Sequence, residues 1–394
     1  MEAQHVVILG AGYAGQMAAA RVAKRRPDAR LTVVDASPVF VERIRLHQIA
    51  AGGRVVSRRM TDVLPRGATF VEGRATSWDV ARRRIAVTTA TGSMELRYDW
   101  CIDTLGSRVD ASVPGVDQHA HRLDDPAGAT RVPAAITRGK RVLIVGAGLT
   151  GIEAATEIAE RHRDVAVTLV ASDALGASLS SAGARHVGDV FARLGVSVRQ
   201  RTRVRALQAN AAMLDGGERI PFDLCLWSGG FVASPLARDA GLPVNARGQV
   251  LVDTTLRVVD HPEIFVAGDA AAVGGADGGE LRMACATAMP MGAYAGEALA
   301  KAIADEPIRP FRFAYRIRCI SLGRRDGLIQ HVDESDRAVP QVWTGRVAAA
   351  IKEIVCRSTV FAIRGEGRLR IPFYRWPQPS VATTPLPQPA AVGD

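Results

Sequence analysis

Two glycine-rich turns are the parts of the sequence best suited to chemistry. Each reads G-x-G-x-x-G, and the glycines concerned are Gly10, Gly12, Gly15, Gly146, Gly148 and Gly151. In this pattern the first glycine permits a tight turn, the second lets the backbone approach a pyrophosphate, and the third lets the following helix pack closely. The N–H groups at the start of that helix bind phosphate oxygens. The repeat therefore predicts two dinucleotide sites in one chain.

The segments around each turn have the composition that this motif requires. An apolar, β-branched run at 5–9 predicts a strand before the first turn, and alanine-rich residues 16–25 predict a helix after it. A second strand, 31–34, ends at Asp35, whose carboxylate is placed to accept hydrogen bonds from a ribose. The order repeats as a strand at 141–145, a helix at 152–160 and a strand at 165–170. The expected fold class is therefore α/β, with two nucleotide-binding folds.

Ala171 breaks the repeat at the position equivalent to Asp35. It follows the second glycine turn by the same number of residues by which Asp35 follows the first. Losing this acid removes the usual preference for an unphosphorylated ribose 2′-hydroxyl, and the immediate neighbours offer no arginine to bind a 2′-phosphate. Arg185, or the arginines between 199 and 205, are the candidates for that role from further away.

Three further motifs follow in order, at residues 98–107, 223–231 and 255–269, the last being a buried-strand pattern that ends in Gly268 and Asp269. Together with the glycine turns, this order resembles the FAD-dependent pyridine nucleotide-disulfide oxidoreductase superfamily over residues 4–300. Within it the chain is similar to type II NADH dehydrogenases and apoptosis-inducing-factor-like proteins. The resemblance implies that the first fold holds FAD, that the second holds NADH or NADPH, and that the FAD domain resumes after the NAD(P) domain.

The resemblance also implies which residues bind the cofactors. For FAD they are Gly10, Gly12, Tyr13, Ala14, Gly15, Asp35, Ala36, Arg43, Ala75, Thr104, Leu105, Gly106, Gly268, Asp269, Ala286, Thr287 and Ala288. For NAD(P) they are Gly146, Gly148, Thr150, Gly151, Ser228, Gly229 and Gly230. A helix that begins at Cys285 is expected to face the flavin with its N-terminus, where the helix dipole would stabilise negative charge on the reduced ring.

Glu153 and His47 are the candidate catalytic residues. Glu153 matches a family glutamate on the nicotinamide side of the flavin, although a carboxylate that opens a helix also suits the helix dipole. His47 lies in 40–48, where disulfide reductases of the superfamily carry redox cysteines; no cysteine occurs there, so flavin-linked disulfide reduction is excluded. If the segment keeps its place, Arg43, Arg45 or His47 approaches the cofactor, and a histidine there can exchange the proton that accompanies hydride transfer. Capping or surface pairing is the structural alternative.

Two departures from the family pattern concern cysteine and the electron acceptor. The five cysteines include no C-x-x-C spacing, so neither a zinc site nor a local redox disulfide is expected, and no metal is assigned. Residues 285–286 and 290–291 read Cys-Ala and Pro-Met where quinone-reducing relatives carry an Ala-Gln pair and further glutamines. This departure weakens the assignment of a quinone as acceptor.

Positive charge is concentrated near the C-terminus of a chain whose net charge is +10. A strand, turn and strand are expected at 316–327, and an amphipathic helix at 344–355 with the apolar face Val347, Ala350, Ile351, Ile354 and Val355. Packing of this helix on the protein's own core and docking on an anionic membrane, as in the quinone-reducing relatives, are both open. Nucleic acid is not expected as a partner, because few aromatic residues interleave with the arginines.

The expected architecture is two interleaved Rossmann-like domains and a small α+β domain. The FAD domain is assigned to 1–112 and 248–309, the NAD(P) domain to 113–247, the C-terminal domain to 310–376, and a disordered tail to 377–394. Without a membrane-length apolar run or a signal-peptide pattern, a cytoplasmic protein is expected, with peripheral contact at the inner face of the membrane as an open alternative.

The expected function is an FAD-dependent oxidoreductase that passes hydride from NADH or NADPH through flavin N5 to a quinone or another small acceptor. One alternative is a flavin-dependent dehydrogenase or oxidase that acts directly on an organic metabolite and has a non-productive second fold, which the alanine at position 171 motivates. Another is a non-enzymatic flavin-binding protein. The sequence does not identify the acceptor, the preferred nicotinamide or the oligomeric state.

Overall fold

The computed structural model describes residues 3–124, 126–275, 277, 279–369 and 373–379. Its first sheet is six-stranded, and β1 in the middle of it pairs in parallel with β2 and β9. In spatial order its strands are β21 (Arg257–Val258), β22 (His261–Val266), β9 (Trp100–Asp103), β1 (His5–Leu9), β2 (Arg30–Asp35) and β5 (Thr69–Glu72). Strands from two distant parts of the chain thus form one sheet, as interleaved domains require. The domain boundaries themselves remain a prediction.

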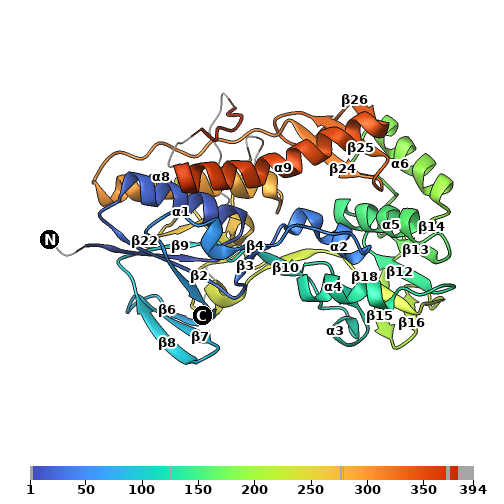
Figure 1. The fold of residues 1–394 in the computed structure, drawn as a ribbon, viewed down its shortest axis with the longest axis horizontal. Helices are drawn as coiled ribbons and strands as arrows, with labels where there is room; N and C mark the ends of the chain where they lie inside the picture. Colours follow the sequence, from blue (N-terminus) through green and yellow to red (C-terminus); the bar gives the residue numbers. More distant parts are fainter. Residues whose placement is uncertain (1–2, 125, 276, 278, 370–372, 380–394) are drawn as a thin grey trace, which may run out of the picture.

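The second sheet repeats this arrangement in the other half of the molecule (Figure 1). Its strands, in spatial order, are β11 (His121–Arg122), β18 (Leu224–Trp227), β12 (Arg141–Val145), β13 (Ala166–Val170) and β14 (Ser197–Arg199). The central strands of both sheets are buried and rich in Val, Ile and Leu, which is typical of parallel strands covered on both faces. The α/β class and the paired nucleotide-binding folds are confirmed.

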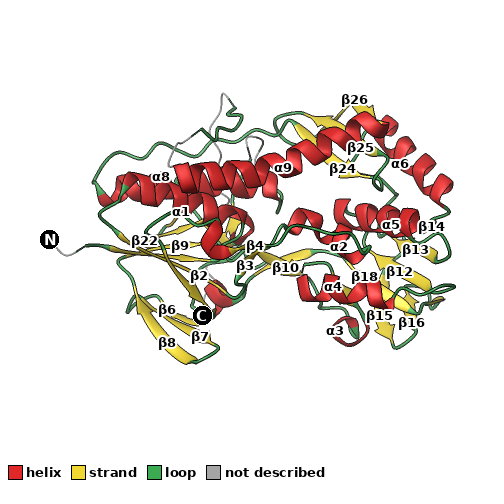
Figure 2. Ribbon diagram, viewed as in Figure 1, coloured by secondary structure: helices red, strands yellow, loops and turns green. Residues whose placement is uncertain are grey.

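Helices cover the two sheets, and the other strands form separate small sheets (Figure 2). The main helices are α1 (Tyr13–Arg25), α2 (Leu46–Ala50), α4 (Pro126–Ala135), α5 (Leu149–Arg161), α6 (Ser181–Leu194) and α8 (Cys285–Ile303). Two three-stranded sheets, β6–β8 and β15–β17, span Arg74–Asp79, Arg84–Thr89, Gly92–Arg97, Val204–Gln208, Ala211–Leu214 and Arg219–Pro221. Short pairs join β3 (Val39–Phe40) to β4 (Arg58–Arg59), β10 (Ser107–Val109) to β19 (Phe231–Ala233), and β20 (Val250–Leu251) to β23 (Ala271–Ala272).

The C-terminal part contains one strand more and a much longer helix than the sequence predicted. The strands are β24 (Ile317–Ser321), β25 (Gly327–Val332) and β26 (Ala338–Thr344), and α9 then runs over Gly345–Leu369. Figure 1 shows α9 passing from this sheet to α1. The expected end near Val355 is wrong, because buried Thr359, Val360 and Ile363 continue the core-facing stripe for two further turns.

A buried ion-pair network holds α1 against α8 and α9. The guanidinium of Arg21 donates to both carboxylate oxygens of Glu366 and to Glu297, and it also donates to the carbonyl of Tyr374 at 2.9 Å. Arg21 and Glu366 are both almost fully buried, whereas Arg25 on the same helix is 53% exposed and lies 3.6 Å from Glu297. The network therefore joins the first helix of the chain to the last.

We expect the substitution Arg21→Met to lower the free energy of unfolding by about 3–5 kcal/mol, because it leaves the Glu366 carboxylate buried without its partner. Urea unfolding followed by far-UV circular dichroism measures the change. Arg25→Met is the matched control, and its effect should stay below about 1 kcal/mol because its ion pair is exposed. Equal effects of the two substitutions would contradict a dominant role for the buried network.

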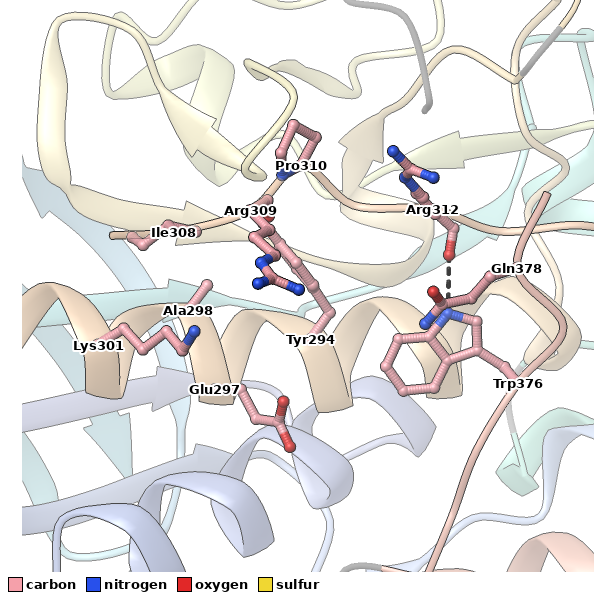
Figure 3. A pocket seen from close by; sticks show the side chains of 10 residues that line it. All are labelled: Tyr294, Glu297, Ala298, Lys301, Ile308, Arg309, Pro310, Arg312, Trp376 and Gln378. Atoms are coloured by element: carbon pink, nitrogen blue, oxygen red, sulfur yellow. Dashed lines mark hydrogen bonds between the residues drawn. The ribbon is translucent and has the colours of Figure 1, made fainter. Parts of the chain in front are cut away.

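The segment after α9 returns along α8. Trp376 Nε1 donates to the carbonyl of Arg312 at 2.8 Å, and the carbonyl of Pro377 accepts from Ala314 N at 3.1 Å. Trp376 and Gln378 line a cavity of about 500 Å³ together with Tyr294 on α8. Figure 3 shows the side chains that line it. Of the tail expected at 377–394, residues 380–394 lie outside the described residues. Within the described part of the chain, no helix combines the length and apolarity needed to cross a bilayer.

Candidate functional site

The first glycine turn is closed by Thr104. Its hydroxyl donates to the carbonyls of Leu9 at 2.8 Å and Gly10 at 2.7 Å. A Cβ built on Gly10 would lie 2.5 Å from the Thr104 carbonyl oxygen, and one on Gly15 would lie 1.9 Å from the Gly10 carbonyl oxygen. A Cβ on Gly12 would meet nothing within 4 Å. The protein's own packing therefore requires two of the glycines, while the third leaves the open space that an approaching pyrophosphate needs.

The carboxylate of Asp35 stands at the carboxyl end of β2, beside this turn. Its oxygens accept hydrogen bonds from the backbone N–H groups of Ala11 at 2.7 Å and Ser37 at 2.8 Å. Burial raises the pKa of Asp35, and these hydrogen bonds with the charge of Arg74 act in the opposite direction. Ala36, next to it, is exposed. A fixed acceptor at this edge of the sheet suits the hydroxyls of a ribose.

Asp269 carries a buried oxygen that has no hydrogen-bond partner among the described residues. Its other oxygen accepts from the Ser107 hydroxyl at 2.6 Å, and Arg43 donates to the Ser107 carbonyl at 2.8 Å. A Cβ on Gly268, the residue before it, would lie 3.0 Å from Ala14. Because an unpaired buried acceptor is costly, the vacant oxygen suits the hydroxyl of a bound ligand. The residues present therefore fit FAD at this edge of the first sheet.

The other candidate FAD residues lie in the 104–106 segment, at the start of α8, and on α1 and β6. Leu105 N donates to Asp103, and Gly106 has a φ of +74°, so the 104–106 segment turns sharply beneath the glycines. Ala288 and Thr287 lie in the first turn of α8, where the Thr287 hydroxyl donates to the carbonyls of Arg282 and Ala284. Further candidates are the buried Tyr13, the exposed Ala286 and, on β6, Ala75.

The second glycine turn reproduces the first in detail. Ser228 takes the place of Thr104, and its hydroxyl donates to the carbonyls of Val145 at 3.1 Å and Gly146 at 3.2 Å. A Cβ on Gly151 would lie 1.8 Å from the Gly146 carbonyl oxygen, whereas one on Gly148 would meet nothing within 4 Å. Thr150, Gly229 and Gly230 flank the turn, with Gly230 at a φ of +74°. The second fold thus offers the same open path for a pyrophosphate.

The strand register places Ala171 where the first fold has Asp35. Leu9 lies opposite Val34 in the first sheet and Val145 opposite Val170 in the second, so Ala171 is the next residue in each comparison. The backbone N–H of Ala171 donates to the carbonyl of Arg199 at 2.8 Å. The structure therefore brings the 199–201 segment beside the position of the missing acid. Arg199 and Arg201 are exposed there, and the Arg199 guanidinium lies 3.4 Å from Glu218. Guanidinium groups are the kind of side chain that binds a 2′-phosphate.

We expect NADPH to reduce the flavin more efficiently than NADH, and Ala171→Asp to reverse this preference. The new carboxylate would repel a 2′-phosphate, and like charges in contact cost several kcal/mol, so efficiency with NADPH should fall by at least about tenfold. Stopped-flow reduction with each nucleotide gives the ratio. The double substitution Arg199→Gln and Arg201→Gln provides an independent check, since it should weaken NADPH alone. An unchanged ratio in both proteins would refute the assignment.

His47 and Glu153, the two catalytic candidates, lie together between α2 and α5. His47 Nδ1 is 3.5 Å from a Glu153 oxygen, and His47 Nε2 has no hydrogen-bond partner among the described residues. The other Glu153 oxygen lies 3.1 Å from the ammonium of Lys352 and accepts from Ser321 N at 3.0 Å. Lys352 also donates to the carbonyl of Cys319 at 3.0 Å. Side chains from three parts of the chain thus form one buried polar cluster.

Burial and charge set the protonation states in this cluster. Burial lowers the pKa of His47 to about 4, with Lys352 contributing in the same direction, so the imidazole is neutral at pH 7. Burial alone would raise the pKa of Glu153, but the ammonium of Lys352 and the Ser321 hydrogen bond hold it below its usual value. Glu153 in turn outweighs the effect of burial on Lys352 and raises its pKa. A carboxylate, an ammonium and a neutral imidazole therefore lie side by side.

Lys352 is the member of the cluster that sequence reasoning missed. Its position on a helix that was expected mainly to cover the core or touch a membrane gave no sign of it. The residue type itself could have pointed to Lys352, because arginine greatly outnumbers lysine in this chain. Lysine holds a compact charge on a flexible stem, and its pKa responds readily to burial, so a rare lysine in an arginine-rich chain is a candidate for a specific role.

Three thiols interact electrostatically with the same ammonium. The charge of Lys352 acts on Cys285, Cys319 and Cys356, but burial dominates and raises the pKa of the first two thiols to about 11. Five cysteines of the described chain are free. In the same part of the chain no group of three or more His, Cys, Asp or Glu side chains is placed to hold a metal ion.

Two matched dinucleotide turns with a buried charged cluster define a class of two-nucleotide oxidoreductases. The chain belongs to the pyridine nucleotide-disulphide oxidoreductase family, whose model matches residues 4–292. It is an enzyme of the NAD(P)H-dependent flavoprotein type with FAD as cofactor, as the sequence predicted.

Similar proteins agree with this assignment. The chain is 28% identical to an NADH dehydrogenase-like protein of Mycobacterium tuberculosis, over 81% of this chain and 85% of that one. It is 29% identical to the alternative NAD(P)H-ubiquinone oxidoreductase C1 of Arabidopsis thaliana, over 82% and 72%. Sulfide:quinone oxidoreductase from Aquifex aeolicus shares the fold with a TM-score of 0.80 at 18% identity, over 93% and 92%. The resemblance to NADH dehydrogenase-like flavoproteins is confirmed.

Proposed function

We propose that the protein transfers electrons from NADPH or NADH to a quinone at a membrane surface. The observation that carries the nicotinamide half of the proposal is the duplicate turn at Gly146–Gly151, in which Gly148 leaves the same open path as Gly12. The names of the Arabidopsis and Aquifex proteins support a quinone as acceptor. The missing glutamines near Met291 argue for a pocket wall that differs from that of the quinone-reducing relatives.

Different residues of the chain would bind FAD, supply a fixed charge and exchange a proton. The turn at Gly10–Gly15, Asp35 and Asp269 would hold FAD, which when bound supplies the ring that accepts hydride and passes electrons onward. Lys352 keeps its proton and supplies a fixed positive charge, and Glu153 fixes the position of that charge. The Nε2 of neutral His47 makes no hydrogen bond in the described chain and lies 3.9 Å from a Glu157 oxygen, so a proton can be taken up there and handed on.

We also propose peripheral contact with the membrane through the C-terminal domain. The outward face of α9 exposes Val347, Ile354 and Phe361, each by about two thirds of its surface, among exposed arginines such as Arg346 and Arg357. Apolar side chains interleaved with cations suit the interface of an anionic bilayer. The apolar residues Val347 and Ile354 thus point to solvent, whereas Ala348 and Cys356 pack inward.

An anaerobic titration tests the donor half of the proposal. Bleaching of the flavin absorbance by NADPH or NADH, followed by reoxidation with a short-chain ubiquinone analogue or menadione, is the expected result. If the flavin were bleached but neither quinone reoxidised it, the assignment of a quinone as acceptor would be wrong. The protein would then be a reductase that uses another acceptor. If neither nucleotide bleached the flavin, direct oxidation of an organic metabolite would become the better explanation.

A further inference from the structure

An arginine-rich groove lies between residues 54–58 and α9, outside the cluster described above. Its volume is about 740 Å³. Six guanidinium groups line it, from Arg45, Arg54, Arg58, Arg357, Arg364 and Arg368, and they face two carboxylates, Glu42 and Glu353. The groove therefore has a strong excess of positive charge.

The two carboxylates are already engaged. Glu42 pairs with Arg45 at 3.0 Å and with Arg58, and Glu353 accepts from Arg45 at 2.8 Å and from Arg357 at 2.8 Å. These pairs hold the walls of the groove in place. They also leave no acidic group of the lining for the remaining arginines.

Two arginines of the groove have no partner in the described chain. Arg368 donates to backbone carbonyls at Thr61 and Asp62. The side chains of Arg54 and Arg364 make no hydrogen bond or ion pair with any described residue. Their planar forks are thus available to an anion, and guanidinium groups bind phosphate oxygens in pairs.

Apolar side chains surround these charges. Val56, Phe361 and Leu369 line the groove and are 67%, 69% and 66% exposed. Large apolar side chains in water are unfavourable, and grouped at a rim they mark a contact surface. A partner with an anionic head and an apolar body matches both features at once, and a free inorganic anion matches only one.

We propose that this groove binds the phosphate head group of an acidic phospholipid, between Arg54 and Arg364, while the apolar rim enters the bilayer surface. The proposal rests on the membrane contact proposed above and gives it a defined, saturable site. It does not depend on the identity of the electron acceptor. Vesicle binding needs no turnover, so failure of this site and failure of the quinone assignment are distinguishable.

The test is co-flotation of the full FAD-loaded protein with vesicles at 0.1 M salt, a condition under which charges farther apart than about 10 Å are screened. Phosphatidylcholine vesicles carry either phosphatidic acid or an amount of oleate that gives the same surface charge. The variant combines Arg54→Gln with Arg364→Gln, which breaks no ion pair. The control combines Arg131→Gln with Arg138→Gln, which removes two exposed charges from α4 and the loop that follows it.

The expected result is tighter binding to phosphatidic acid than to oleate vesicles, and a loss of about thirtyfold in the groove variant, because each arginine at the surface contributes about fivefold. The control should lose less than about threefold. If the two variants lost the same affinity, or if the protein bound the two kinds of vesicle equally well, surface charge alone would explain binding. Either result would contradict a specific phosphate site in the groove. Tight binding of soluble glycerol phosphate without binding to vesicles would show that the ligand of the groove is not a phospholipid.

Discussion

The substitution Gly12→Val is expected to yield protein without FAD. The substitution Gly148→Val is expected to yield yellow protein whose flavin neither NADH nor NADPH can reduce. Both glycines leave open space in the fold, so neither substitution meets another part of the chain at the Cβ. Each places two methyl groups on the path of one pyrophosphate. Overlap of this kind costs about 3 kcal/mol, which corresponds to at least about a hundredfold weaker binding of the nucleotide concerned.

The measurements are the ratio of flavin to protein absorbance for Gly12→Val and the rate of anaerobic reduction for Gly148→Val. The matched control is Gly188→Val on α6, because a Cβ there also meets nothing within 4 Å. It should leave both quantities unchanged. Loss of FAD from Gly148→Val, or normal FAD content in Gly12→Val, would show that the two turns have the wrong ligands assigned.

Lys352→Met is expected to slow flavin reduction by about 10²-fold at pH 7, the cost that follows loss of one preorganised charge in an active site. The substitution removes the main group that keeps the Glu153 carboxylate ionised, so the pKa of Glu153 rises. In the wild type this carboxylate stays ionised as the pH falls through the weakly acidic range. In the variant it takes up a proton there, and the rate should fall with it.

The pH profile of the reduction rate separates this role from a structural one. Lys352→Arg should recover part of the rate and the profile of the wild type, because it keeps the positive charge. Lys301→Met, on α8, removes a lysine for which no ion pair is found in the described chain and should leave both unchanged. A Lys352→Met protein that folds and reduces its flavin within twofold of the wild-type rate, with the same pH profile, would show that Lys352 only supports the fold.

Local patterns determine the two glycine turns, and for this reason they were predictable. The roles of Gly10 and Asp35 depend on neighbours within one strand, turn and helix, and the strand register confirms that Ala171 replaces the second acid. The cluster at Glu153 has a different origin, because His47, Glu153 and Lys352 come from widely separated segments. No spacing rule connects them, and only the packing of α9 on β24 and β25, with β24 against α5, brings the lysine to the carboxylate.

The extent of α9 escaped prediction for a related reason. The helix continues past Val355 through Gly365 and Gly367, which are buried, and a Cβ on Gly365 would lie 2.5 Å from the ring of Phe373. Tertiary packing therefore overrides the weak helix propensity of glycine. The groove could not be foreseen either, since it forms only where this added length passes the 54–58 loop.

The single helix α9 thus carries side chains that contact two different sites. Lys352 reaches inward to Glu153, and twelve residues later Arg364 reaches outward, about 18 Å along the same axis at 1.5 Å per residue. No break in the helix separates the two residues. A lipid held at Arg364 would therefore bind to the same continuous helix that carries the charge beside Glu153.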